Sequence, residues 1–292
     1  MNYKYLLIYV LLFNFAACKS LVNNNDTFAF KPELNKDYHY LISKQTSEQW
    51  HFNNVDNVIY DSADIDITLR CIANNDSRYT CKLIFNDYNL KRHPFTATFN
   101  NTGNFRPVKF VNPFAVLDSL GKYVHDTFLK VEINKEGIVD NVSGIDDLLA
   151  LVSSKANTDK LSAERQLGDY ISTNAVRDLL NPFFSIAPGK KIKDEDMWSS
   201  HFTLVTLAPV KVSSNYLLKN INGDELRLEI SSTTFSQHCE GDPVPLKGKA
   251  NGTAVYSYKS GMPEFYNNNA ETITKTTSYD VIEKMHLMLK EY

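Results

Sequence analysis

Alternation of apolar and polar positions dominates the chain beyond its N-terminal region. Strand-like segments before the middle of the chain are YHYLISKQ, ADIDITLRCI, YTCKLIF and TFLKVEI. Those after the middle are HFTLVTL, PVKVSSNYLL, ELRLEISSTTF, GTAVYSY and PEFYNNNAETITKTTSYDVI. A side-chain period of two is typical of strands with one buried and one wet face. The pattern therefore predicts antiparallel sheet.

One predicted hairpin contains two of the four cysteines, in the run DIDITLRCIANNDSRYTCKLIF. Folding this run about Asp76 gives three facing pairs: Cys71 and Cys81, Leu69 and Leu83, and Ile67 and Phe85. A slip of one residue would destroy this arrangement, because it would move every apolar side chain to the other face. The pattern favours a Cys71–Cys81 disulfide. The alternative is two free thiols buried against the core.

Glycine turns are predicted at three further places. In LKVEINKEGIVDNV, a loop of Lys135, Glu136 and Gly137 places Ile133 opposite Val139. In NYLLKNINGDELRLEI, a loop at residues 221–223 would pair Leu218 with Leu226 and Tyr216 with Leu228. The run YSYKSGMPEFY supplies the third turn.

Helical sequence separates the two groups of strands. Apolar residues on one helix face follow Ser143, which is typical of a capped helix start: Ile145, Leu148, Leu149 and Val152. A second helix is predicted from about Asp159 to Leu180, where Asn181 and Pro182 would stop it, and Gly168 would weaken it without ending it. Both helices are expected to cover the sheet.

The N-terminal region has the layout of a secretory signal peptide, with Lys4 before an apolar stretch from Tyr5 to Ala17. The stretch FAAC resembles the lipobox of bacterial lipoproteins, although Phe15 stands where leucine is commonest. The resemblance implies that Cys18 becomes an acylated N-terminus, which holds a protein at a membrane without a spanning helix. Lys19 differs from the aspartate that retains such proteins at the inner membrane, so we expect the periplasmic side of the outer membrane. Cleavage elsewhere and a retained anchor are the alternatives.

Composition and charge exclude several classes of protein. The chain has 292 residues, of which 43% are hydrophobic and 22% charged, as in a folded protein. A formal net charge of −3 offers no basic field for nucleic acid. We predict no cofactor and no metal.

A small cluster of His238, Cys239 and Glu240 suggests a metal ligand set or a thiol nucleophile, but it has neither ligand spacing nor a visible second partner. The sequence contains no G-x-S-x-G, H-E-x-x-H or phosphate-binding glycine loop. We therefore expect a non-catalytic binding or assembly lipoprotein, with an apolar or glycan ligand or an envelope protein as partner. The alternative is a periplasmic hydrolase, which would require a cleft around these three residues or around a carboxylate pair with shifted pKa values.

The order of elements resembles a known family. The run TFLKVEINKEGIVDNVSGIDDLLALV, the segment APGKKIKDEDMWSS and the later NING and YSYKSGMPEF turns are similar to DUF6263, an uncharacterised lipoprotein family of Bacteroidetes. Asp196 and Trp198 match the end of its Gly-Asp-x-Trp motif, and Glu195 stands where glycine is usual. The resemblance implies an exported β-rich protein and no catalytic residues.

Together these patterns predict a mainly β (α+β) protein with strongly curved antiparallel sheets, in two lobes or one open barrel. The expected segments are a signal peptide (1–17), a lipidated tether (18–30), an N-terminal β lobe (31–143), a helical segment (144–185) and a C-terminal β lobe (186–292).

Overall fold

The computed structural model describes residues 27–52, 55–93, 127–155, 157, 159–168, 171–205, 209–236, 246–275 and 280–292. Its strands in the first half are β1 (Asp37–Phe52), β2 (Val55–Asn74), β3 (Arg78–His93), β4 (Leu129–Asn134) and β5 (Val139–Ser143). The helices α3 (Ile145–Lys155), α4 (Lys160–Leu167) and α5 (Thr173–Phe184) follow. The second half contains β6 (Met197–Val205), β7 (Pro209–Asn222), β8 (Glu225–Ser236), β9 (Leu246–Ser257), β10 (Pro263–Lys275) and β11 (Asp280–Glu291).

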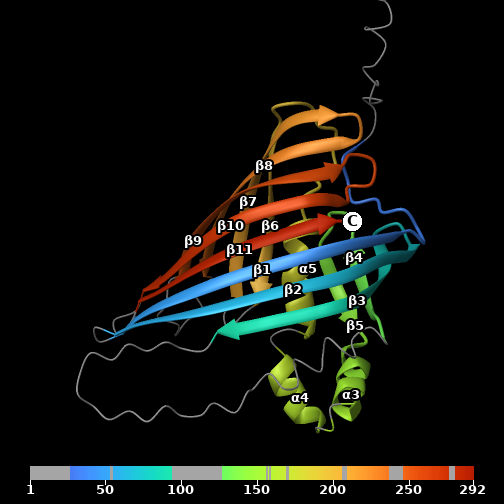
Figure 1. The fold of residues 1–292 in the computed structure, drawn as a ribbon. Coiled ribbons are helices and arrows are strands. Elements are labelled where there is room, and N and C mark those ends of the chain that lie inside the picture. The colour runs from blue at the N-terminus through green and yellow to red at the C-terminus, as the bar shows by residue number, and fades with distance from the viewer. Residues whose placement is uncertain are drawn as a thin grey trace, which may run out of the picture.

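All of these strands belong to one antiparallel sheet, in the order β5-β4-β3-β2-β1-β11-β10-β9-β8-β7-β6. The first and last strands, β1 and β11, pair in its middle, so the two β regions of the sequence form a continuous surface (Figure 1). The sheet is not closed, and β5 and β6 are its two edges. The predicted class, mainly β with an intervening helical segment, is confirmed.

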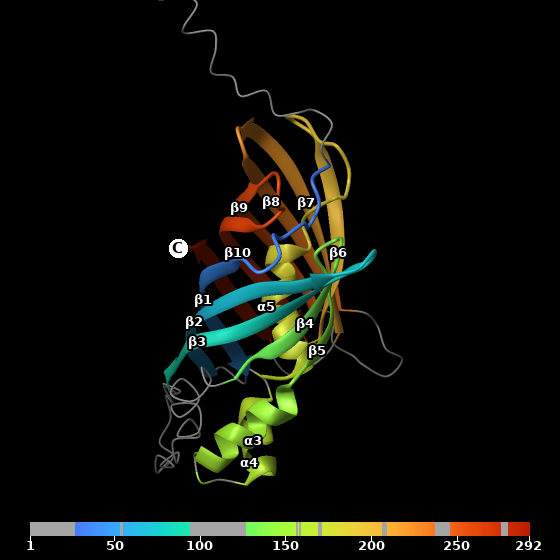
Figure 2. The same cartoon turned by 90° about the vertical axis from the view of Figure 1, so that its right-hand side faces the viewer.

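Helix α5 packs inside the curve of the sheet, as Figure 2 shows. Its Asn181 side chain accepts a hydrogen bond from the Val139 N–H of β5 at 2.9 Å. The Tyr256 hydroxyl of β9 donates to the Phe183 carbonyl at 2.6 Å. Phe183 and Phe184 are fully buried, so the end of α5 fills the concave face with aromatic side chains. Burying these rings stabilises the packing of the helix against the sheet.

The Cys71–Cys81 hairpin has the predicted register, with Leu69 opposite Leu83 and Ile67 opposite Phe85. The two cysteines form a disulfide. The predicted pairing of Ile133 with Val139 is also confirmed.

The register predicted for β7 and β8 is wrong. Leu218 faces Leu228, and Tyr216 faces Ile230. The turn contains two residues, 223 and 224, and a bulge at Lys219 restores the alternation that a two-residue turn would otherwise disrupt.

The predicted second helix is also wrong in its extent, because it is two helices. The Ser172 side chain accepts a hydrogen bond from the Ala175 N–H at 3.1 Å and so starts α5 as a separate helix. Pro182 does not stop α5, which continues to Phe184. Burial of the two phenylalanines outweighs the one backbone hydrogen bond that proline removes.

Contacts in the segment before β6 show the structural roles of the residues that match the family motif. The Asp196 carboxylate accepts a hydrogen bond from the Lys193 N–H at 3.0 Å. The Trp198 indole donates to the Ile186 carbonyl at 2.7 Å. Glu195 has a φ of 68°, in the left-handed region where glycine is favoured, so the turn forms in spite of the glutamate.

No helix in the described part of the chain is both long enough and apolar enough to cross a membrane.

Candidate functional site: a polar groove on the outer face

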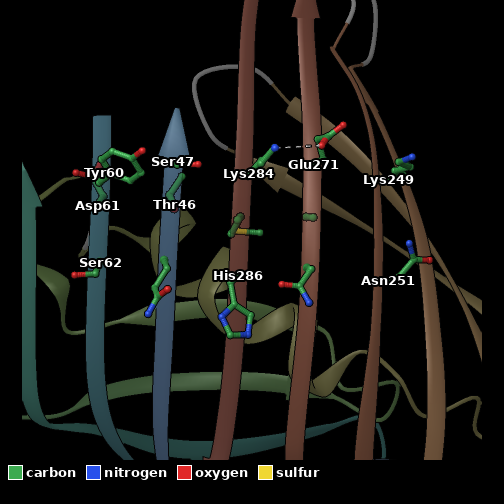
Figure 3. Close-up of a pocket in the computed structure, with 14 residues that line it drawn as sticks. Thr46, Ser47, Tyr60, Asp61, Ser62, Lys249, Asn251, Glu271, Lys284 and His286 are labelled. Atoms are coloured by element: carbon green, nitrogen blue, oxygen red, sulfur yellow. Dashed lines mark ion pairs between the residues drawn. The ribbon is translucent and has the colours of Figure 1, made fainter. Parts of the chain in front are cut away.

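Alternation along the strands separates an inner face, which packs on α5, from an outer face. A groove of about 700 Å³ lies on the outer face, across β2, β1, β11, β10 and β9 (Figure 3). Ten of its fourteen lining residues have the outward parity, and Thr46, Asp61, Ala270 and Met285 alternate with them.

The ten outward residues form two parallel rows that run across the strands. The first row, in the order of the strands, is Tyr60, Ser47, Lys284, Glu271 and Lys249. The second row is Ser62, Gln45, His286, Asn269 and Asn251. Each residue directly faces the next across a strand pair, so the two rows make a continuous polar strip with an aromatic ring at one corner.

Most polar groups in the strip have no hydrogen-bond or ion-pair partner among the residues that the structure describes. Within the described residues, seven of these side chains make no hydrogen bond or ion pair: Gln45, Ser47, Tyr60, Ser62, Lys249, Asn251 and Asn269. Lys284 and Glu271 are 4.0 Å apart, at the limit of an ion pair, as the dashed line in Figure 3 marks. The His286 ring contacts the Asn267 amide oxygen at 2.9 Å.

The run of asparagines in β10 is unusual for the interior of a strand, where Asn is depleted. Asn267 contacts His286, and Asn268 points inward and donates to the Tyr266 hydroxyl at 3.1 Å. Asn269 has no such partner among the described residues and lies in the groove. Packing therefore does not account for Asn269.

The groove carries both acidic and basic side chains. Among the residues that the structure describes, no group of three or more His, Cys, Asp or Glu is placed to hold a metal ion. The charged lining residues are two lysines, Lys249 and Lys284, and two acids, Asp61 and Glu271. Their formal charges cancel.

A carboxylate pair does occur elsewhere, on the inner face. Glu48 and Glu283 face each other across β1 and β11. Burial raises the pKa of Glu283, and repulsion by Glu48 adds to the effect, while nearby Lys44 opposes it. Neither glutamate lines the groove.

A smaller hollow of about 430 Å³ lies at one end of the sheet, between the chain segments around Lys31 and Ser260. It contains Glu264 and Glu291, and burial raises the pKa of both carboxyl groups.

Of the site residues predicted from the sequence, Cys71 and Cys81 are joined as a disulfide. Cys18, His238, Cys239 and Glu240 lie outside the described residues. The groove was missed, because its residues are scattered between positions 45 and 286. One local signal pointed to it: the consecutive asparagines in a predicted strand.

The fold and the groove define a protein with a single open antiparallel sheet, a helix in its concave face and a polar hollow on the other face. The sequence model of a protein family, described as a family of unknown function (DUF6263), matches residues 112–263, more than half of the chain. The chain therefore belongs to this family. No curated protein sequence matches it.

Of two solved structures that match the chain, one shares its fold and the other has a TM-score below 0.5. The first, described as lipid-protein interactions in lipovitellin, has a TM-score of 0.51 and 11% identity, over 89% of this chain and 25% of that chain. The present chain thus spans about a quarter of the length of the lipovitellin chain, and the likeness is one of fold. The translocator domain of autotransporter NalP from Neisseria meningitidis has 8% identity over 98% of this chain and 96% of that chain, with a TM-score of 0.21, which does not indicate a common fold.

Proposed function

We propose that this protein is a non-catalytic ligand-binding lipoprotein of the cell envelope. Acyl chains on Cys18 hold it at the periplasmic side of the outer membrane, and the outer groove binds a polar ligand. The lipobox-like FAAC and the following Lys19 support the anchor and the membrane. The groove supports the binding role.

The observation that carries the binding role is the set of seven polar side chains in the groove that make no hydrogen bond or ion pair with other described residues. A ligand that hydrogen-bonds to them need not break bonds within the protein, so its binding keeps most of the gain from each new bond.

The fold similarity to lipovitellin raises the question of a lipid ligand instead. A lipid would require an apolar hollow on the concave face. There, α5 and its phenylalanines occupy the curve of the sheet, and Phe183 packs edge-on against Tyr266 with ring centres 5.0 Å apart. The outer groove is therefore the better site.

The anchor is tested by the intact mass of the protein extracted from membranes. We expect a chain that begins at Cys18 and carries acyl chains, whereas a Cys18→Ala variant should carry no acyl chains. An unmodified chain cut at another position would refute the anchor.

The groove is tested with two preparations from the source cell envelope. One is its water-soluble fraction, and the other is a suspension of vesicles made from its phospholipids. We expect the water-soluble fraction to raise the unfolding temperature of the wild-type protein. The double variant Asn251→Ala/Asn269→Ala should lose this shift. A matched control, Asn141→Ala/Asn220→Ala, removes two exposed asparagines from β5 and β7, away from the groove, and should keep it. Equal shifts in all three proteins, or a shift with vesicles alone, would refute a polar ligand in the groove.

A further inference from the structure

The two rows of the groove match the shape of an extended ligand that lies across the strands. Five neighbouring strands at about 4.8 Å spacing give each row a length of roughly 19 Å. No bulge interrupts the pairing of the groove residues in these strand pairs, so both rows run straight across the strands. A chain of several sugar rings has this length and this linear shape.

Tyr60 stands at one end of the first row and is 54% exposed. Tyr60 makes no hydrogen bond to a described residue. A tyrosine face is electronegative and attracts the C–H groups on the face of a sugar ring. An exposed ring beside polar side chains is therefore suited to a ligand with apolar faces and hydroxyl edges.

The second row provides hydrogen bonds of both kinds. Gln45, Asn251 and Asn269 each present an amide oxygen that accepts and an amide nitrogen that donates. Ser62 adds a hydroxyl, which also does both. Sugar hydroxyls likewise donate and accept, so this row matches them along its length.

The charge of the groove argues for an uncharged ligand. The two lysines and two acids among the lining residues cancel, and the second row contains no carboxylate, lysine or arginine. A site for an acidic ligand would instead carry an excess of lysine or arginine.

We propose that the ligand of the groove is an uncharged oligosaccharide, which lies along the two rows with one sugar ring stacked on Tyr60. This inference rests on the proposed function, since it specifies the ligand of the same groove.

The test separates the water-soluble envelope fraction by anion exchange into an uncharged pool and an anionic pool. Half of each pool is treated with periodate, which cleaves vicinal diols of sugars. We expect the untreated uncharged pool to raise the unfolding temperature of the wild-type protein, and periodate to abolish the effect. The pool concentration for half-maximal effect should not change from about 0.1 M to about 1 M NaCl, over which the Debye length falls from roughly 10 to 3 Å.

Tyrosine variants test the stacked ring. Tyr60→Ala should raise the half-maximal concentration about tenfold, and Tyr60→Phe should leave it almost unchanged, because the ring face is kept. Tyr60 is exposed, so neither change should impair folding. An Ala variant that binds as well as wild type would overturn the stacked geometry.

The outcomes separate this inference from the proposed function. If the activity is in the anionic pool, falls with salt or survives periodate, while Asn251→Ala/Asn269→Ala still abolishes it, the groove binds a polar ligand that is not an uncharged oligosaccharide. The inference then fails and the proposed function stands. If no pool shifts the wild-type protein, or the shift is insensitive to the asparagine variant, both fail.

Discussion

Replacement of Gly137 by alanine tests the contact between the β4–β5 turn and the end of α5. Gly137 has a φ of 80°, and an added Cβ would lie 1.8 Å from the Phe184 carbonyl oxygen. Gly189 is a matched control, with a φ of 65° and nothing within 4 Å of an added Cβ. Gly189→Ala should cost about 1–2 kcal/mol, the penalty for a left-handed alanine.

Gly137→Ala carries the same backbone penalty and must also push the turn away from α5. That movement would lengthen or break the hydrogen bond from the Val139 N–H to Asn181, which is 2% exposed. Loss of a buried bond adds about 1–3 kcal/mol, for a total of roughly 2–5 kcal/mol.

Urea unfolding, followed by tryptophan fluorescence, measures both variants. Trp198 is buried and close to this region through its bond to Ile186, so it reports on the unfolding of the core. The packing argument fails if Gly137→Ala is no less stable than Gly189→Ala.

Three further predictions concern stability. Cys71→Ala/Cys81→Ala should lower the free energy of unfolding by roughly 2–3 kcal/mol, because the disulfide closes a loop with a sequence separation of 10; a reductant should lower the urea midpoint of the wild type and not of the variant. Glu195→Gly should raise the free energy of unfolding by about 1 kcal/mol in the same urea measurement, since glycine tolerates the φ of 68°. A variant no more stable than wild type would contradict the idea that the Glu195 backbone is strained. The folded state raises the pKa of Glu283, so its charge destabilises the fold at neutral pH and the penalty disappears as pH falls below the usual glutamate range. Glu283→Gln should therefore be more stable than wild type at pH 7 and equal to it in acid, and an advantage independent of pH would refute this sign.

Local patterns predicted the elements and some of their pairing. The register of the Cys71–Cys81 hairpin was predictable, because one alignment satisfied both the alternation and the facing sulfurs. The β7–β8 register was not, because the two-residue turn at 223 and 224 agrees with the alternation only when the bulge at Lys219 is added. The split between α4 and α5 was missed, since Ser172 starts a helix whose position depends on burial of Phe183 and Phe184.

The groove shows the limit of local reasoning most clearly. Ser47 is near the start of the chain and Lys284 near its end, yet they face each other across β1 and β11. No periodicity in either segment specifies this pairing.

The sequence by itself determined that this protein is a mainly β chain with a central helical segment, and which side chains share a face of each strand. This follows from steric and hydrophobic rules that act over a few residues. Only the tertiary structure decided the strand order and hence the polar strip on the outer face. Pairing between strands distant in sequence depends on which arrangement lets the whole sheet curve around α5 and bury its aromatic residues, a free energy that belongs to the assembled fold.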